Sequence, residues 1–532
     1  MKFKNHVIVL FVVISFSVMA GCFDSGGSDG SDDGGQTEVE HTETYTVADG
    51  QTVSENDIVR LVNGEIETAK MNTEIEVDDA FEEFASHACF ISASPITSEK
   101  VIIAYYDFNN GNAIGRVSVL SISGNTVTAG TPVTFNDYST QATSIAVVSS
   151  NKAIVSYWDN GNTGYIKARA LSISGNDITM GDPIVVNTGY TYRDFAICAL
   201  TENEALIVYT KEPETLNSYG FARVLSIPQD GYSLTLEPES PVVFSYDRTS
   251  YLSVSALSEG KAIVIYSIVA DNSQYCKARL IERTSDGISL STPALVDDTE
   301  NMYARGNPPV AALTENKVIV LYKNSTGDHF ARILTIDENS ILQGPGIQLT
   351  NGSWLDELSV SAFNSNKAII TYRSNDGAPH PGIAQNLLIS DNSIIPGGTI
   401  IFESERADSN MLCTLSANKC IVAYQHFDSR KGHVKIITSY SDYGDIIGIS
   451  KENKPSGELC QVAEFGNSTH IYDLSELIAG DTYYIDVNGN LTTIPNYVPP
   501  QPVNQIFTSI KNYIVGVAED ESTIEVTGEY SN

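Results

Sequence analysis

One pattern of hydrophobic and polar positions occurs seven times along the chain. Each copy has a small residue, a turn, a lysine, three β-forming residues and a tyrosine, most clearly in residues 255–266 and 311–322. The tyrosines, spaced by 52, 52, 57, 56, 50 and 52 residues, are Tyr105, Tyr157, Tyr209, Tyr266, Tyr322, Tyr372 and Tyr424. A lysine stands five residues before each tyrosine, except that the third copy has Glu204. A fixed period repeated this often predicts a repeat architecture.

Each period predicts four short strands. The first ends in the small-residue segment, and an Asn or Gly before the lysine supplies the backbone conformation that a tight hairpin requires. The second strand is apolar throughout and is therefore predicted to be buried on both faces. Residues 166–173 and 178–186 are examples of the third and fourth strands. Four antiparallel strands per roughly 50 residues are typical of propeller blades. We therefore predict an all-β fold in which residues 85–440 form a seven-bladed β-propeller of four-stranded blades.

The innermost strands and the closure of the ring can also be predicted. Small residues stand six positions before each lysine position, as expected where strands converge on an axis: Ser94, Ala146, Cys198, Ser255, Ala311, Ser361 and Cys413. Cys198 and Cys413 are interpreted as core-filling residues of Ser or Ala size. The seventh copy has only three strands, and residues 73–77 are predicted to supply its outer strand, which would cover an exposed edge.

The N-terminal segment has the features of an export signal. Lys2 and Lys4 precede an apolar run over residues 7–16, which is too short to span a bilayer, and residues 19–22 place small residues before Cys22. This segment resembles the lipobox of bacterial lipoproteins. The resemblance implies a signal peptide over residues 1–21, lipidation of Cys22 and attachment to a membrane of the bacterial cell envelope, facing the periplasm or the cell surface. Residues 22–42 are rich in Gly, Ser and Asp and are predicted to form a flexible tether.

The segments on either side of the repeats are also predicted to be β-structure. Residues 482–492 form a predicted hairpin around Asn488-Gly489, and residues 513–517 and 522–526 form another. Residues 441–532 are similar to small C-terminal β-modules of phage tail and bacterial surface proteins, which implies attachment or assembly. Residues 43–84 are predicted to be an N-terminal β-segment, and its first part is expected to pack on the C-terminal module. The repeat region itself resembles bacterial β-propeller proteins as a class, which concerns the fold alone.

Composition limits the classes of partner. The formal net charge of −35 argues against nucleic acid, because phosphates would be repelled. It favours cationic partners or divalent ions, although adaptation to a salt-rich habitat explains it equally well. None of the six cysteines after Cys22 forms a C-x-x-C pair, so the sequence contains no zinc or thioredoxin-like motif of that kind.

Three sets of polar residues are candidates for chemistry. A cation recurs in the third strands, where pairing with carboxylates or backbone carbonyls is favoured over a ligand-binding ring: Arg116, Arg169, Arg223, Arg279, Arg332 and Lys435, with Gln385 in the sixth copy. Acidic residues follow the second strands, where they could attract Ca²⁺ or a cationic partner, although solvated turns are the favoured interpretation: Asp107, Asp159, Asp271, Asp328, Asp376 and Asp428. The same loops contain four histidines that could form a metal or acid–base cluster, although separate surface histidines are favoured: His329, His380, His426 and His433.

The sequence contains no nucleophile elbow, phosphate-binding glycine loop or His-Glu-x-x-His motif, so no catalytic residue is assigned. A binding or scaffolding platform for a glycan or protein partner is therefore the favoured function, with no cofactor other than a possible Ca²⁺ ion. The alternatives are a propeller-type polysaccharide hydrolase or lyase and a structural or assembly factor of the cell envelope.

Overall fold

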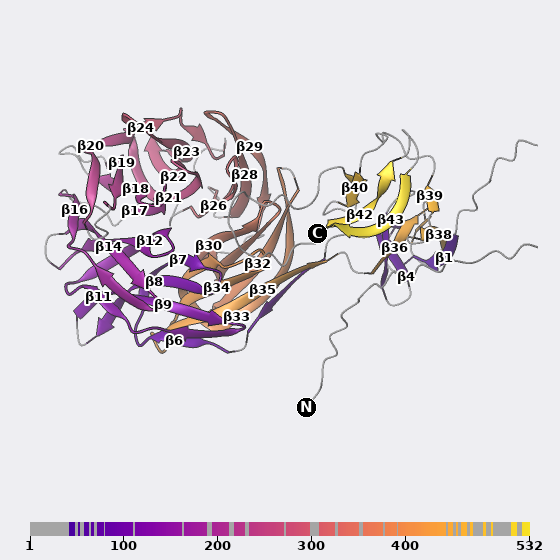
Figure 1. Cartoon of the computed structure of the whole chain (residues 1–532), viewed down its shortest axis with the longest axis horizontal. Helices are drawn as coiled ribbons and strands as arrows, with labels where there is room; N and C mark the ends of the chain where they lie inside the picture. The colour runs from indigo at the N-terminus through magenta and orange to yellow at the C-terminus, as the bar shows by residue number, and fades with distance from the viewer. Residues whose placement is uncertain are drawn as a thin grey trace, which may run out of the picture. The chain divides into compact units, whose positions relative to one another are not determined.

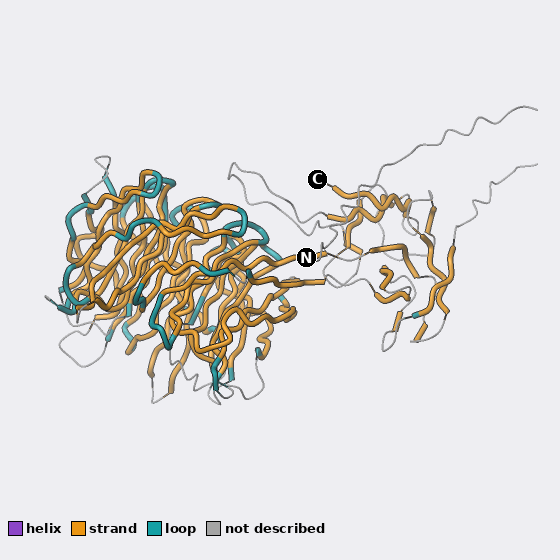
Figure 2. The backbone as a smooth tube through the Cα atoms, turned by 90° about the horizontal axis from the view of Figure 1, so that it is seen from below, coloured by secondary structure: helices purple, strands orange, loops and turns teal. Residues whose placement is uncertain are grey.

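The computed structural model consists of strands and loops, with no helix among the residues that it describes (Figures 1 and 2). These residues are 42–47, 52–53, 58–62, 65–68, 72–78, 80–109, 112–161, 164–188, 194–211, 218–228, 233–270, 273–297, 308–324, 328–349, 355–375, 378–390, 392–442, 445–450, 454–455, 459–464, 469–471, 482–485, 491–492, 512–518 and 524–531. The predicted signal peptide, Cys22 and most of the predicted tether lie outside them. Within these ranges no helix is long and apolar enough to cross a membrane.

Five antiparallel sheets of four or five strands follow one another along the repeats. The first contains β7 (Cys89–Thr97), β8 (Lys100–Asn109), β9 (Asn112–Ser123), β10 (Thr126–Ala129) and β11 (Val133–Asn136). The second contains β12 (Thr140–Ser149), β13 (Lys152–Asp159), β14 (Tyr165–Ser174), β15 (Asp177–Met180) and β16 (Ile184–Asn187). The third contains β17 (Phe195–Ala199), β18 (Glu204–Lys211), β19 (Tyr219–Ser226) and β20 (Thr235–Ser245). The fourth contains β21 (Arg248–Ser258), β22 (Lys261–Ala270), β23 (Ser273–Thr284), β24 (Gly287–Leu290) and β25 (Ala294–Leu295). The fifth contains β26 (Val310–Thr314), β27 (Lys317–Lys323), β28 (His329–Asp337) and β29 (Ser340–Gln348).

The last two repeats share one eight-stranded sheet. Its strands are β30 (Leu355–Asn364), β31 (Lys367–Ser374), β32 (Pro381–Ser390), β33 (Ser393–Thr414), β34 (Lys419–His426), β35 (Gly432–Asp442), β5 (Asn72–Val77) and β6 (Glu82–Ala85). The 22-residue strand β33 pairs with β32 through its first part and with β34 through its second, so it serves both repeats. β5 pairs with β35, from Ile437↔Val77 to Asp442↔Asn72, at the outer position for which the sequence predicted this strand.

The first strands of successive repeats lie side by side and return to the beginning. β7 contacts β12, and the series continues through β17, β21, β26, β30 and β33, which in turn contacts β7. Serine hydroxyls join these strands: the backbone N–H of Ile145 donates to Ser92 Oγ over 3.1 Å, and that of Val147 donates to Ser94 Oγ over 3.1 Å. Ser144, Ser255 and Ser359 accept equivalent bonds from the next first strand. Small polar residues recur here because they let the strands approach and satisfy backbone donors between them.

The recurrent lysines also link neighbouring repeats. Lys100 Nζ donates to the carbonyl of Gly175 in the second repeat over 3.0 Å, and Lys419 Nζ in the seventh donates to Gly124 in the first over 3.1 Å. The exception, Glu204, makes the corresponding link with opposite charge, because its Oε1 lies 3.2 Å from Nη2 of Arg283 in the fourth repeat. The lysine position is therefore structural.

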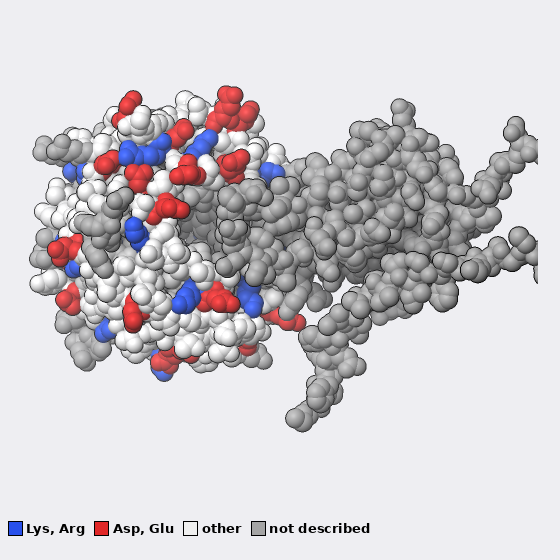
Figure 3. All heavy atoms as spheres, in the orientation of Figure 1, with Lys and Arg blue, Asp and Glu red and all other residues white. Residues whose placement is uncertain are grey.

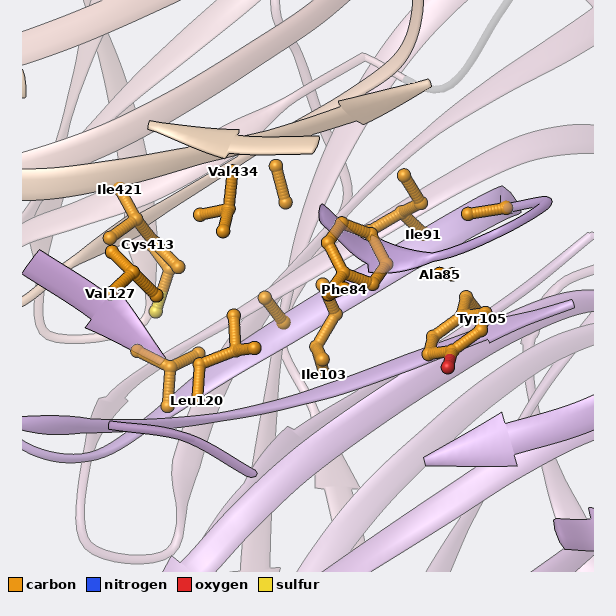
Figure 4. Close-up of a cluster of buried hydrophobic side chains, with 14 of the residues drawn as sticks. Phe84, Ala85, Ile91, Ile103, Tyr105, Leu120, Val127, Cys413, Ile421 and Val434 are labelled. Atoms are coloured by element: carbon orange, nitrogen blue, oxygen red, sulfur yellow. The ribbon is translucent and has the colours of Figure 1, made fainter. Parts of the chain in front are cut away.

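The hydrophobic core lies between the sheets. Tyr105, Tyr157, Tyr209, Tyr266 and Tyr424 are all at most 1 % exposed. Figure 4 shows one of these layers, in which Phe84 of β6 and Val434 of β35 pack with Ile103 and Tyr105 of β8. Cys198 and Cys413 are buried and free of disulfides, as core-filling residues should be. Burial raises the pKa of each of these two thiols to about 12.

The remaining strands form separate sheets. One has the order β1 (Thr42–Thr46), β38 (Leu459–Glu464), β36 (Asp445–Ser450), β3 (Ile58–Val62) and β4 (Glu65–Thr68). A two-stranded sheet pairs β2 (Thr52–Val53) with β37 (Lys454–Pro455). The last has the order β39 (Thr469–Ile471), β43 (Ile524–Ser531), β42 (Asn512–Ala518), β40 (Thr482–Ile485) and β41 (Leu491–Thr492). Strands that precede the repeats thus pair with strands that follow them.

Candidate functional site

Asp107 and Asp159 are buried, not solvated turn residues. They lie at equivalent positions, two residues after the repeat tyrosine, and are 5 % and 0 % exposed. Asp107 Oδ2 lies 2.8 Å from Arg116 Nε, and Asp159 Oδ2 lies 2.7 Å from Lys167 Nζ. The predicted turn solvation is wrong for these two residues, because Asp107 lies within β8, Asp159 is the last residue of β13, and β9 and β14 place a cation beside each of them.

The register of the strands also corrects the grouping of Arg116. Ile103 pairs with Ser118 in the first repeat, whereas Val155 pairs with Arg169 in the second, so Arg116 is equivalent to Lys167.

The other recurrent polar residues form structural contacts. Arg169 Nη1 donates to Gly181 O over 2.7 Å, and Lys435 Nζ donates to Phe402 O of the preceding repeat over 2.9 Å. The side chains of Arg223, Arg279 and Gln385 also donate hydrogen bonds to backbone carbonyl oxygens. Arg332 forms an ion pair with Asp297 over 2.9 Å.

Two of the four candidate histidines come together. The rings of His426 and His433 are 5.3 Å apart, and His433 stacks on Phe81 at 4.2 Å. His426 Nε2 lies 3.1 Å from Glu405 Oε2, while the N–H of Ser429 donates to His426 Nδ1 over 3.3 Å. Because Nδ1 accepts this hydrogen bond, Nε2 is the ring nitrogen that donates towards Glu405.

The other predicted site residues are dispersed. His329 begins β28 and is 3 % exposed; burial lowers its pKa to about 4. His380 precedes β32 with a φ of 65°. Asp328 donates its backbone N–H to Asn324 Oδ1 over 2.8 Å, and Asp428 lies in an exposed turn. Asp271 and Asp376 lie outside the described residues. Within the described residues no group of three or more His, Cys, Asp or Glu side chains is arranged to hold a metal ion.

In five of the seven repeats, a position that was not predicted from the sequence precedes the central part of the first strand. Fifteen residues before the repeat tyrosine, the backbone bulges and takes a positive φ at a residue other than glycine: Phe90 (49°), Ala142 (57°), Tyr251 (55°), Glu357 (54°) and Ser409 (55°). Asp194 occupies the same position before Tyr209, and position 307 lies outside the described residues. Such backbone strain costs about 1–3 kcal/mol per residue and is concentrated at functional sites. We call these positions the bulge ring.

The bulge ring lies at one end of the sheets and carries different chemistry in each repeat. Cys89 pairs with Tyr106 and Thr140 pairs with Asp159, so the bulges lie beside the last residues of the second strands. We call this end of the sheets the loop end. Asp194 accepts a hydrogen bond from the backbone of Tyr251, and burial raises its pKa to about 6. Glu357 Oε2 accepts from the N–H of Ser409 over 2.9 Å, and desolvation likewise raises the pKa of Glu357.

Four aromatic side chains form a continuous row that begins at the bulge ring and runs outward over the first repeat. Phe90 and Tyr106 have ring centroids 6.0 Å apart, Tyr106 and Phe108 are 6.4 Å apart, and Phe108 and His87 are 5.6 Å apart. Phe90 is 39 % exposed and Phe108 is 43 % exposed. Isolated exposed aromatic residues are common, but a contiguous set indicates an interaction site. We call these residues the aromatic row.

Charge on the surface is mixed. Acidic and basic side chains are interspersed over the described part of the face drawn in Figure 3. Near the bulge ring, Arg373 Nη2 lies 2.8 Å from Asp356 Oδ2, and Arg373 also pairs with Asp408. Arg406 Nε lies 3.0 Å from the same Asp408 carboxylate. These charges compensate one another locally, despite the net charge of the chain.

Comparison with solved structures finds matches at low sequence identity and with TM-scores below 0.5. The chain is similar to a protein of unknown function from Dyadobacter fermentans (12 % identity, 73 % of this chain and 99 % of that one, TM-score 0.38). It is also similar to a lectin from Burkholderia pseudomallei (11 % identity, 69 % and 99 %, TM-score 0.49) and to a sialidase from Streptococcus pneumoniae (11 % identity, 67 % and 68 %, TM-score 0.38). The chain matches no protein-family model and no curated protein.

Proposed function

We propose that the chain is a lipid-anchored, extracytoplasmic β-propeller of seven blades that binds a glycan at its loop end. Seven registered tyrosines and the closed series of contacts between first strands support the blade count. In this proposal the eight-stranded sheet is two blades that share β33. Residues 1–21 and Cys22 support the signal peptide and the lipid anchor, which would place the body on the outer side of a bacterial membrane.

The observation that carries the binding role is the aromatic row. A sugar ring has an apolar C–H face that packs on aromatic rings, and its hydroxyl groups require polar partners at the edges. The row supplies the apolar surface, and the bulge ring at its inner end supplies carboxylates and a hydroxyl. Most recurrent polar residues have structural partners, so a binding site is expected where the repeats differ. The aromatic row and the bulge ring both differ from repeat to repeat.

A polysaccharide hydrolase or lyase is the second candidate, on a specific observation. Asp194 and Glu357 occupy equivalent positions in the bulge ring, and both carboxyl groups have raised pKa values. A raised pKa is what a general acid near neutral pH requires. Each of these carboxyl groups also accepts a backbone N–H of the next repeat, which gives it a structural role and leaves binding as the preferred function.

Replacing Phe108 with alanine is expected to weaken glycan binding roughly five- to tenfold, because stacking of this kind contributes about 1 kcal/mol. The melting temperature should change little, since Phe108 is 43 % exposed. Binding of the full chain to a glycan array, followed by titration calorimetry on the best ligand, measures this effect. Tyr246→Ala is the matched control, because Tyr246 is an exposed aromatic residue (73 %) outside the row. Equal loss in both variants, or in neither, would argue against the aromatic row.

A further inference from the structure

A short strand from before the repeats completes the sheet of the seventh repeat next to the aromatic row. β6 pairs with β35 through three residue pairs, and a register shift interrupts them. Residues 86–90 follow β6 directly and contain two members of the aromatic row, His87 and Phe90. The backbone N–H of Ala88, which lies between them, donates to Arg430 O over 3.1 Å. The placement of the aromatic row therefore depends on the contacts that hold β6 against β35, which we call the clasp.

His433 fastens the beginning of β6 to β35. Its ring stacks on Phe81, the residue before β6, with the centroids 4.2 Å apart, and the edge contact with the ring of Tyr424 measures 5.7 Å. The residue is 6 % exposed. The strand register places His433 opposite the repeat tyrosine, where the third and fifth repeats have Phe221 and Phe330. A ring that cannot take up a proton is therefore compatible with the fold at this position.

The groups around His433 leave little to compensate a positive charge on its ring. The charged and titratable residues that face His433 or its neighbour on β34 are His426, Tyr424, Glu403, Glu405, Glu83 and Lys431. Two of the carboxylates would favour a charge on His433, but both have other partners. Glu83 Oε2 lies 2.6 Å from Lys431 Nζ, and Glu403 Oε2 accepts the hydroxyl of Tyr424 over 2.9 Å. The ring of His426 lies 5.3 Å away, and its carboxylate partner is Glu405.

The clasp fits a neutral imidazole. Nδ1 of His433 is buried and has no hydrogen-bond partner among the described residues. Both nitrogens of an imidazolium are donors, so protonation would bury a charged N–H without an acceptor. Burial lowers the pKa of His433 below its ordinary value of 6.5, and the positive charges of His426 and Lys431 lower it further. Because the folded chain binds this proton more weakly than the unfolded chain, the stability that neutral His433 gives is present above a pH of about 6.5 and is lost as the pH falls below it.

We propose that His433 makes the clasp sensitive to acid, so that protonation of its ring loosens β6 and releases a glycan from the aromatic row. This inference rests on the proposed glycan-binding function and adds the regulation of that site by pH. His87 and Phe90 lie on the segment that follows β6, so a shift of β6 changes the spacing of the rings on which a sugar would stack. At the proposed location outside the cytoplasm, the clasp would respond to the pH of the surroundings.

His433→Phe tests the clasp, because Phe221 and Phe330 show that phenylalanine fits the equivalent position. Titration calorimetry on the full chain measures affinity for the glycan found on the array. Between about pH 7.5 and about pH 5 the wild type is expected to lose about tenfold in affinity, as if the clasp were closed in about one molecule in ten. His433→Phe should bind like the wild type at the higher pH and lose at most about two- to threefold at the lower one, since His87 and the other titratable groups remain.

Hydrogen exchange of residues 81–90, measured without glycan and corrected for the intrinsic effect of pH, tests the clasp by itself. Protection should fall about tenfold at the lower pH in the wild type and persist in His433→Phe. Wild-type protection that does not depend on pH, or an equal loss in both chains, would show that the clasp is wrong, while binding at neutral pH would leave the proposed function intact. Acid-sensitive protection with constant affinity would refute the release of the glycan. If no glycan binds at any pH, the proposed function and the release fail together, and exchange still decides on the clasp. Should His433→Phe not fold, His433→Ile replaces it with the same expected results, because isoleucine occupies the equivalent position 383.

Discussion

Replacing Ile75 and Val77 together with aspartate is expected to destabilise the repeat body severely. Both residues lie on β5, which pairs with β35, and both pack against the core that contains Phe402 and Ile437. Each substitution removes apolar contacts and places a carboxylate at a half-buried position, at a cost of about 2–3 kcal/mol per site. The free strand edge of β35 would also be exposed to intermolecular pairing. Thermal unfolding followed by circular dichroism, together with size-exclusion chromatography, measures the loss of stability and any aggregation.

The control for this variant is Glu76→Gln on the same strand. Glu76 is exposed on the other face of β5, so its substitution should leave the melting transition unchanged. If the Ile75/Val77 variant unfolds at the wild-type temperature, β5 does not complete the sheet of the seventh repeat in solution.

Replacing Asp159 with alanine is the second substitution with a large expected effect. The carboxylate is fully buried, it pairs with Lys167 Nζ at 2.7 Å, and it accepts a weaker bond from Asn136 Nδ2 at 3.4 Å. Removing one member of a buried ion pair leaves the other charge uncompensated and typically costs about 3–5 kcal/mol. Chemical denaturation should show this loss of stability, while affinity for divalent cations should not change.

Two further variants complete the test of Asp159. The double variant Asp159→Leu with Lys167→Met removes both charges and should recover much of the stability, because apolar pairs often replace buried ion pairs without loss. Asp428→Ala, in an exposed turn at the same end of the sheets, should leave stability unchanged. Wild-type stability in Asp159→Ala combined with a loss of Ca²⁺ affinity would restore the metal-binding interpretation of the acidic loops.

The repeated strands could be predicted because their signals are local. The tyrosine, lysine and small-residue positions recur at a nearly constant spacing, and they correspond to buried core residues, links between repeats and contacts between first strands. The sequence could not show that β33 continues without a break from one repeat into the next, because residues 404–409 contain the polar residues expected of a loop. Pairing with β32 on one side and β34 on the other satisfies their backbone groups.

The candidate site was harder to predict, for a reason that Asp107 and Arg116 illustrate. Their roles depend on which residues face each other across two strands. The sequence alignment of the first repeat was shifted by two residues, which grouped Arg116 with Arg169 although Arg116 is equivalent to Lys167. Asp159 could be located at the end of its strand, but its burial depends on Lys167 from the next strand. The bulge ring carries no residue type in common, since Phe90, Ala142 and Glu357 share only a backbone conformation. Only the constant distance of fifteen residues to the tyrosine could have revealed it.

We propose that the loop end binds a glycan without cleaving it. The most direct test incubates the full chain with the polysaccharide that it binds on the array and analyses the products by mass spectrometry. The polysaccharide is expected to remain bound and to be recovered at its original length, and Phe108→Ala is expected to reduce the bound fraction. Shortened or unsaturated products that disappear in an Asp194→Asn or Glu357→Gln variant would contradict a purely binding function and identify the chain as a polysaccharide-degrading enzyme.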